Sequence, residues 1–551
     1  MKFKEYIFAS ISCVLVSVIL IISDLFDFNH LANFLFILVS LVCMLIAWKN
    51  ANWLFWLFFA LLPLEKVVIS PINFPLSLRP YQLIGAILIV VMIAKWVIGK
   101  SKFRFISFKK ICLLCRLAVG DKCDLGKSQK SFGFYDRLVF SLPIFAFLGL
   151  VSSPDRAVSL KLTLVLISFI ALFWLARNFL QTTIRRLEAL WFFAIGSIPV
   201  LLFGIYQSLA FKLGWRHFEV FEARINATFT EPDWFGIYLA FLLALELLFL
   251  IAIEKSKVQK VMIGKFDAFK LARGAVFADV FLIISLLIMT VSRSAWLGAA
   301  IVILAFFAGS FFIFKENLSY VAGKNLAALA LVFVLSFITI NLLDLSDFHF
   351  ANRASSSVSG MQKITISCEK GSNVPREIEN ISKLGKYDCR HINLEEIATE
   401  ISAGNEVKEV FRPDPNVQIR KNIYAQSWQQ IKKHPILGQG LGSSSAILGK
   451  DSHGSGFNAS NIFLETWFSM GIGGLAVIVL VLLAPLVKAK KKLLDLKSGK
   501  TEIVKNVQFG LLFVLFTSGA IIIPNLFNSG LLLGFFWIWL AAIISVIDEV
   551  E

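Results

Sequence analysis

Residues 420–480 read RKNIYAQSWQQIKKHPILGQGLGSSSAILGKDSHGSGFNASNIFLETWFSMGIGGLAVIVL. A polar segment runs into a His-Pro break at 434–435, then a Gly-rich loop, then a long apolar segment. Apolar side chains recur at helical intervals over 417–433, which predicts an amphipathic helix that ends before Pro435. The stretch therefore joins an ordered polar element directly to a membrane helix.

The composition of the whole chain is that of a polytopic membrane protein. Hydrophobic residues make up 57% of the 551 positions, and the chain contains 54 Phe. A soluble fold cannot cover that much apolar surface. The net charge of +17 would favour nucleic acid in a soluble chain. In a membrane protein it fits positively charged cytoplasmic loops, so no nucleic-acid partner is expected.

Fourteen apolar segments approach the length that a bilayer demands of a helix, about 20 residues. The expected fold class is therefore all-α, with 12 to 14 transmembrane helices and one large extracytoplasmic loop. The segment 51–64 is the weakest because it is short and ends at Pro63. The fourteen segments are 6–23, 31–48, 51–64, 81–98, 138–153, 158–176, 187–211, 234–253, 275–292, 295–314, 325–343, 459–486, 507–524 and 530–547.

The distribution of basic residues decides between the possible numbers of transmembrane helices. Residues 99–137 carry ten Lys or Arg, 254–273 carry six and 488–505 carry seven. With both termini in the cytoplasm, all three connections fall inside, as the positive-inside rule requires. Omitting 51–64 alone would move the segment 99–137 outside, so fourteen spans fit best.

This topology divides the chain into three parts. Residues 1–343 form an N-terminal transmembrane bundle of about eleven helices, and 457–551 supply about three more. Residues 344–456 form a large extracytoplasmic loop whose charges nearly balance, with fourteen Lys or Arg against thirteen Asp or Glu. A loop of that length carries function or is disordered. Its half 353–412 shows little periodicity and is expected to be partly irregular.

Cysteine usage leaves a disulfide open and argues against a metal site. Cys368 and Cys389 are the two cysteines of the external loop, where an oxidising compartment would allow them to pair or to stay free. Cys112, Cys115 and Cys123 offer three ligands without a nearby His, one short of a usual zinc site. No HExxH, P-loop or GxGxxG cluster occurs, so neither a metal nor a cofactor is expected.

Three places beside the membrane collect unusual polar residues, and the topology puts all three on the outer face. They are RINATFTEPDWFGIY (224–238), TVSRSAWLG (290–298) and the stretch 420–480. Arg293 lies between apolar segments, where a charge is either paired for function or reaches the lipid headgroups. Both readings stay open. For Arg224, solvation in a polar loop is the simpler explanation, and for Arg420 a charged helix face is.

Taken in order, these motifs resemble the O-antigen ligase and polymerase family. SRSAWLG (292–298) looks like the family's Arg-containing turn, and RINATFTEPDWFGIYLA (224–240) is similar to its Arg-containing loop, with Asp233 where Asn is commoner. SWQQIKKHPILGQGLGS (427–443) matches the family's Trp-Pro-Gly-x-Gly segment. NIFLETWFSMGIGGL (461–475) resembles the helix that follows that segment.

The resemblance implies a set of site residues. Family members handle polyprenyl-diphosphate-linked glycans, and their external arginines hold the diphosphate, which here implies Arg224, Arg293 and Arg420. Guanidinium groups bind phosphate oxygens bidentately and stabilise charge on a leaving diphosphate. Gly438, Gly440 and Gly442 are either a phosphate cradle or, more simply, permissive backbone.

The acceptor side departs from the family pattern. Many members place a His before the Asn of the last motif as the general base, whereas this chain has Ser460 before Asn461. His453, seven residues before Ser460, is the candidate base, since His has a suitable pKa for proton transfer. A surface histidine without a catalytic task, or transfer without a His base, stays open. His434 is read as structural.

The sequence thus predicts a multi-pass cell-membrane glycosyltransferase of the O-antigen ligase or polymerase type. It would move a glycan from a polyprenyl-diphosphate carrier to an acceptor hydroxyl on a glycan, lipid or protein, at an extracytoplasmic site and without a metal or cofactor. The alternative is a transporter or flippase of a lipid-linked polysaccharide. A transporter usually buries ionisable residues in the middle of its spans, where this chain offers Glu246 and Asp279. A scaffold role is the third candidate.

Overall fold

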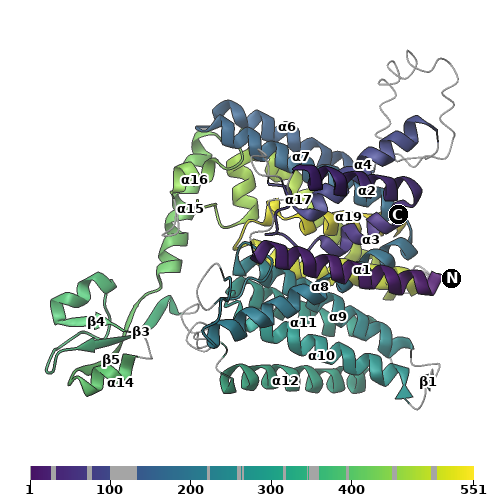
Figure 1. The fold of residues 1–551 in the computed structure, drawn as a ribbon. Helices are drawn as coiled ribbons and strands as arrows, with labels where there is room; N and C mark the ends of the chain where they lie inside the picture. The colour runs from purple at the N-terminus through teal and green to yellow at the C-terminus, as the bar shows by residue number, and fades with distance from the viewer. Residues whose placement is uncertain are drawn as a thin grey trace.

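The structure is a computed structural model of the 551-residue chain. It describes residues 2–26, 33–70, 77–99, 133–219, 224–256, 262–263, 266–313, 318–343, 345, 359–392, 396–449, 456–497 and 505–550. The long helices lie side by side in one bundle, and a small β-sheet projects from one end of it (Figure 1).

Each of the fourteen expected spans coincides with a helix. The helices are α1 (Lys2–Leu25), α2 (Asn33–Lys49), α3 (Ala51–Leu61), α4 (Pro80–Val97), α6 (Phe134–Gly149), α7 (Arg156–Phe179), α8 (Thr183–Lys212), α9 (Pro232–Ser256), α10 (Ala268–Met289), α11 (Arg293–Ile313), α12 (Leu318–Leu342), α17 (Ile462–Lys497), α18 (Lys505–Asn525) and α19 (Gly534–Val550).

Among the described residues, eleven helices are long and apolar enough to cross a membrane by length and composition. The helices α2 and α3 are shorter, and α19 has 17 residues. At 1.5 Å per residue, the segment α3 extends only about 16 Å, roughly half the thickness of a bilayer core. The chain is therefore a polytopic membrane protein, and the number of fourteen crossings stays a prediction.

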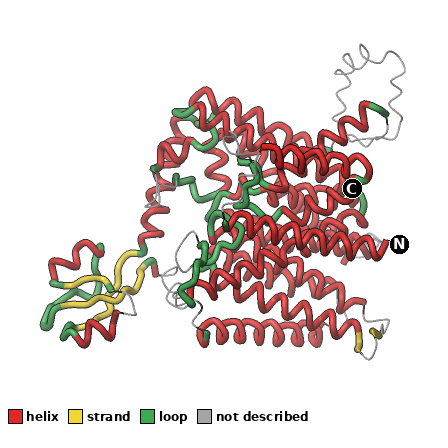
Figure 2. The backbone as a smooth tube through the Cα atoms, in the orientation of Figure 1, coloured by secondary structure: helices red, strands yellow, loops and turns green. Residues whose placement is uncertain are grey.

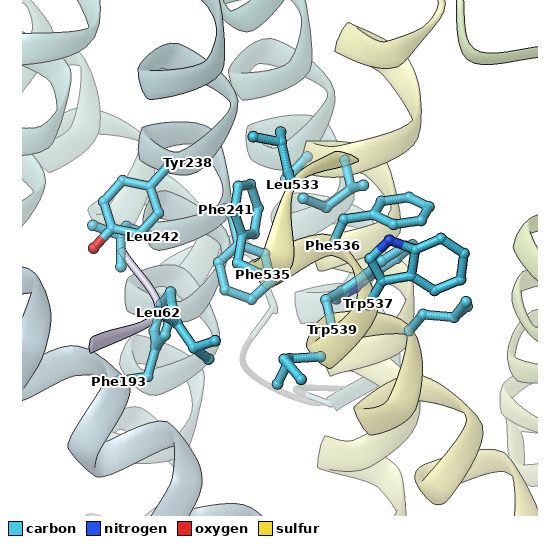
Figure 3. Close-up of a cluster of buried hydrophobic side chains, with 14 of the residues drawn as sticks. Leu62, Phe193, Tyr238, Phe241, Leu242, Leu533, Phe535, Phe536, Trp537 and Trp539 are labelled. Carbon is cyan, nitrogen blue, oxygen red and sulfur yellow. The ribbon is translucent and has the colours of Figure 1, made fainter. Parts of the chain in front are cut away.

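The helices of the C-terminal segment complete the N-terminal bundle instead of forming a separate one. Helix α18 packs against both α9 and α11, α19 packs against α7, and α17 packs against α6. Figure 3 shows how Phe535 of α19 reaches Tyr238 and Phe241 of α9, with ring centroids 6.1 and 6.3 Å apart. Residues far apart in the sequence thus share one continuous apolar core.

The bundle has two distinct ends. Both chain termini lie at one end, here called the terminal end, and the sheet with its neighbouring helices lies at the other, here called the sheet end (Figure 1). At the terminal end, the buried Arg177 of α7 donates hydrogen bonds to Asp136 of α6 and Asp548 of α19. Its Nε lies 2.7 Å from the nearer Asp136 oxygen. These contacts join three helices whose ends lie far apart in the sequence.

In its described part, the first half of the large loop combines a small sheet, which the sequence did not predict, with loop segments such as 369–380. Strands β3 (Met361–Cys368), β4 (Cys389–His391) and β5 (Glu406–Pro413) form an antiparallel sheet in the order β4-β3-β5, drawn yellow in Figure 2. A disulfide joins Cys368 to Cys389. Ile364, Ile366 and Val410 belong to a small core of the sheet's own. The alternation in these short strands is too brief to stand out from the polar sequence around it.

Candidate functional site

The three polar places of the sequence meet at the sheet end. The first lies before α9, the second is the turn between α10 and α11, and the third, residues 420–480, takes in most of α15 (Pro415–Lys433) and the first half of α17. Helix α15 covers the expected amphipathic segment and runs across the end of the bundle instead of along the long helices (Figure 1). Figure 2 shows loop segments gathered between α15 and the bundle.

Arg224 is held against the second motif and is not simply solvated, contrary to the expectation for a polar loop. Its Nε donates a hydrogen bond of 3.1 Å to the carbonyl oxygen of Thr290, in the turn that precedes Arg293. Its Nη2 lies 3.6 Å from a carboxylate oxygen of Asp233, in the first turn of α9. The first and second motifs are therefore one structural unit.

The loop that carries Arg224 enters the bundle. Asn226 and Thr228 are buried, and the Thr228 hydroxyl donates a 2.7 Å hydrogen bond to the carbonyl oxygen of Pro63, after α3. Gln207 of α8 accepts hydrogen bonds from the backbone of Asn226 and Ala227. Because the backbone of this polar segment is satisfied by buried partners, the loop has a fixed shape.

Arg293 is the first residue of α11 and forms an ion pair with Asp414, at 3.0 Å between Nη1 and a carboxylate oxygen. The Asp414 side chain is only 1% exposed, whereas that of Arg293 is 21% exposed. The Asp414 carbonyl oxygen accepts hydrogen bonds from Val417 and Gln418, so Asp414 also begins α15. Of the two readings of Arg293, pairing is the one that the structure favours.

Arg420 lies on α15 one turn before Tyr424. The Tyr424 hydroxyl donates a 3.2 Å hydrogen bond to the carbonyl oxygen of Ser460, which ties the helix to the start of α17. Burial raises the pKa of Tyr424, while the nearby Arg420 acts in the opposite direction. Arg420 is thus half-buried beside the loop that holds Ser460, and it is not a plain surface residue.

Of the three candidate residues on the acceptor side, the structure describes Ser460 and Asn461. Asn461 caps α17, because its Oδ1 accepts hydrogen bonds from the backbone of Phe463 and Leu464, and its Nδ2 donates to Leu526. Ser460 has a left-handed backbone, with φ of 49°, at the corner before this cap. The prediction for His453 lies outside the described residues. His434 follows the last residue of α15, as its structural reading expects.

The Gly-rich loop pairs with a break in α17. Gly471 has φ of 67° and ψ of −172°, which interrupts the helix and exposes backbone groups on both sides of the break. Gln439 and Gly440 donate backbone hydrogen bonds to Phe468 and Ser469, at 2.8 and 2.9 Å. A Cβ at Gly438 would lie 2.5 Å from the Gly471 nitrogen. The loop glycines therefore permit close backbone contact, and the engagement of the Gly438 and Gly440 N–H groups by His434 and Ser469 argues against a phosphate cradle.

Three residues that support the candidate site were not identified from the sequence. Asp414 could have been recognised as a helix cap from its place between two prolines, but its pairing with Arg293 crosses 121 residues. Asn528 donates a 2.9 Å hydrogen bond to Ser294 and so supports the turn that carries Arg293. Glu465 is buried and accepts hydrogen bonds from Ala459 and Ser444, which fixes the loop before α17. No local pattern in the sequence marks these long-range contacts.

Within the described ranges, no group of three or more His, Cys, Asp or Glu side chains could hold a metal ion.

A family model described as O-Antigen ligase matches residues 278–479. This match takes in most of α10, all of α11 and α12, the sheet, α15 and the first half of α17. It includes the second and third polar motifs. A comparison with curated proteins finds no match to the chain.

Proposed function

We propose that the chain is a membrane glycosyltransferase of the O-antigen ligase type that acts at the sheet end, because a family model of that description matches residues 278–479. The donor is a glycan on a polyprenyl diphosphate, and the acceptor is a hydroxyl group of a glycan, lipid or protein. Transfer joins the glycan to the acceptor oxygen and releases the polyprenyl diphosphate. The acceptor proton passes to a base. The donor already carries an activated leaving group, so the reaction consumes no nucleotide.

The observation that carries this proposal is the meeting of Arg224 and Arg293 at one short turn. Arg224 binds the carbonyl oxygen of Thr290, three positions before Arg293. Two half-buried guanidinium groups at the membrane surface form a favourable place for a diphosphate. Negative charge grows on the leaving diphosphate as the sugar–phosphate bond breaks, and fixed cations lower the energy of that transition state.

The acidic neighbours of these arginines support a role in which the guanidinium groups are oriented in advance. Asp233 and Asp414 each hold one guanidinium in place before the donor arrives. A cation that is already oriented needs little rearrangement during the reaction, which is the source of its catalytic benefit. Arg420, on α15, is the third cation of the proposed diphosphate site, as the resemblance to the family implies.

We place the acceptor beside the loop before α17, next to Ser460. The proposed base is His453, because it belongs to this loop and imidazole can accept a proton near neutral pH. The side chain of Asn461 is engaged in capping α17, so its proposed contribution is to hold Ser460 and the helix start in place.

Charge and cysteine chemistry support an extracytoplasmic site. The terminal end carries both chain termini and the Lys-rich end of α17, which the positive-inside rule assigns to the cytoplasm. The disulfide of the sheet fits an oxidising compartment on the opposite side. The donor would then be used at the outer leaflet.

The test uses purified protein in nanodiscs with a fluorescent oligosaccharide on polyprenyl diphosphate. We expect the wild type to release glycan from the carrier when an acceptor is present. Arg293→Ala should lower this rate by about 100-fold or more, as removal of a transition-state donor typically does. Retention of wild-type turnover in Arg293→Ala would contradict the proposed site. Movement of intact labelled lipid across the bilayer, without cleavage, would instead identify a transporter.

A further inference from the structure

The connection between α15 and the Gly-rich loop carries an exposed apolar surface. Ile436 is 71% exposed, and Trp428, in the second half of α15, is 45% exposed. The indole rings of Trp428 and Trp467 of α17 meet edge to face, with their centroids 5.5 Å apart. Large apolar side chains that gather on a surface mark a contact with another molecule or with a membrane.

This surface is fixed against the break in α17. The carbonyl oxygen of Pro435 accepts hydrogen bonds from the indole N–H of Trp467 and from the backbone N–H of Ile472, at 3.1 and 3.0 Å. A Cβ at Gly471 would lie 1.8 Å from the carbonyl oxygen of Ile436, so the two backbones are in contact. Residues 435–436 therefore lie at the same height along α17 as Gly471.

The spacing of charged residues along α17 gives that height in the membrane. After Gly471 the helix has no charged residue until Lys488, 17 positions later. At 1.5 Å per residue the two positions lie about 26 Å apart, whereas the hydrocarbon core of a bilayer is about 30 Å thick. With Lys488 at one headgroup layer, Gly471 lies just inside the opposite edge of the hydrocarbon. A helix break at this depth needs partners within the protein, and the Gly-rich loop supplies them.

The exposed surface is continuous with a side of α17 that faces lipid. Exposed apolar residues recur along α17 after the break, at Ile472, Leu480, Leu483 and Val487. Their spacing of eight, three and four residues places them on one face of the helix. The hydrogen bond between Pro435 and Ile472 joins this face to residues 435–436.

Basic residues accompany the apolar ones. Lys432 and Lys433 form the end of α15, and both are exposed. The ammonium nitrogen of Lys432 lies 5.8 Å from the ring centroid of Trp428. Tryptophan rings lie at the boundary between hydrocarbon and headgroups, and lysine side chains extend from that level to the phosphates. Charge and residue type thus both match a phospholipid surface.

We propose that the end of α15 and residues 434–436 are seated in the bilayer leaflet at the sheet end, with Ile436 among the acyl chains and Lys432 and Lys433 at the headgroup phosphates. Helix α15 runs across the end of the bundle (Figure 1), which is the orientation of an interfacial helix. Part of the large loop is then a membrane anchor that sets the height of the Gly-rich loop. This inference does not depend on the reaction that the protein catalyses.

The experiment places a photocrosslinking benzophenone amino acid at position 436 of the full-length protein, in nanodiscs of phosphatidylcholine and phosphatidylglycerol. Illumination should add the mass of one phospholipid to the chain in an intact-mass spectrum. The same amino acid in place of Leu483, on the lipid-facing side of α17, is the positive control. The matched negative control replaces Ile401, which is 59% exposed in α14 (Ile397–Ser402) beside the sheet, and should give no lipid adduct.

Four results would overturn the proposal: a lipid adduct at position 483 but none at 436, equal adducts at 436 and 401, a crosslink from 436 to a second copy of the chain, or loss of the lipid adduct at 436 when farnesyl diphosphate is added. The last would assign the surface to a polyprenyl chain instead of the bilayer. If the variant at 436 does not fold, the benzophenone replaces Trp428, where the same lipid adduct is expected and its absence would equally contradict the anchor.

Discussion

Arg177 at the terminal end and Arg293 at the sheet end are the same residue type in opposite situations. The Arg177 side chain is 1% exposed and donates to Asp136, Asp548 and Ser545. The Arg293 side chain is 21% exposed and pairs with Asp414. The first arginine is enclosed by its partners, whereas the second keeps part of its side chain accessible.

The contrast separates an arginine that is enclosed between helices from one whose side chain stays partly exposed. A buried ion pair with matched partners fixes geometry but leaves no charge for another molecule. At the sheet end the side chains of Arg224 and Arg293 are partly accessible, as contact with a ligand requires. Substitutions at the two ends should therefore affect different properties.

The largest effect is expected for Arg177→Ala. Removing this side chain leaves Asp136 buried without its guanidinium partner, and breaking a buried pair in this way costs about 3–5 kcal/mol of stability. The midpoint of heat-induced unfolding in detergent should fall strongly, together with the yield of monodisperse protein. Arg293→Ala is the matched variant. It also leaves a buried carboxylate, Asp414, without this guanidinium, but it should lose less stability because the Arg293 side chain is 21% exposed, against 1% for Arg177. Equal losses of stability in the two variants would remove the distinction between the ends.

The sequence singled out Arg293 as unusual but not Arg177. Arg293 was recognisable because it interrupts an apolar stretch, whereas Arg177 ends one and reads as an ordinary basic residue at the membrane surface. Its partners Asp136 and Asp548 become neighbours only when α6, α7 and α19 pack together. Long apolar periods reliably predicted where helices lie. Contacts between distant polar residues could not be predicted, because a single sequence carries no information on which helix ends meet.

The sheet was not predicted for the same reason, because its strands pair across a long stretch of sequence. Strands β3 and β5 pair over eight positions, from Met361–Pro413 to Cys368–Glu406, although 37 residues separate the ends of the two strands. Neither strand is apolar enough to be recognised alone, and only the register between them buries Ile364 against Val410. The helix α15 was predictable because its spacing is local.

The second prediction concerns the break in α17. Gly471→Ala places a Cβ 1.8 Å from the carbonyl oxygen of Ile436, in a backbone region that is open almost only to glycine. The strain alone costs about 1–3 kcal/mol, and the Gly-rich loop should detach from α17. Both thermal stability and glycan transfer should fall. Gly323→Ala in α12 meets nothing within 4 Å and has ordinary helical backbone, so it should be neutral or slightly stabilising.

Third in expected size is Asp414→Asn, which tests whether the sheet end depends on positioning. The amide keeps the shape and the backbone contacts of Asp414 but loses the charge that holds Arg293 at 3.0 Å. We expect kcat to fall about tenfold, the lower end of the value of a hydrogen bond to a charged group, while thermal stability changes little. Because one negative charge is removed next to the proposed diphosphate site, KM for the donor should stay the same or fall.

A rise in KM with unchanged kcat in Asp414→Asn would mean that the carboxylate does not orient Arg293 for the reaction. Asp233→Asn provides the parallel measurement on Arg224, whose separation from its carboxylate is larger, at 3.6 Å. A smaller effect is expected there, since the attraction between two charges weakens with distance.

The smallest effect is expected for Tyr424→Phe, which removes the 3.2 Å hydrogen bond from α15 to the carbonyl oxygen of Ser460. One neutral hydrogen bond contributes about 1 kcal/mol, so stability should change little. Its position next to Arg420 and to the loop before α17 nevertheless predicts a measurable loss of transfer, about two- to fivefold, through looser placement of that loop.

Burial raises the pKa of Tyr424, so the phenol is a neutral donor over the physiological range. The defect should therefore be the same at pH 6 and at pH 8. A defect that disappears at one of these values would show that Tyr424 acts through ionisation rather than through this hydrogen bond.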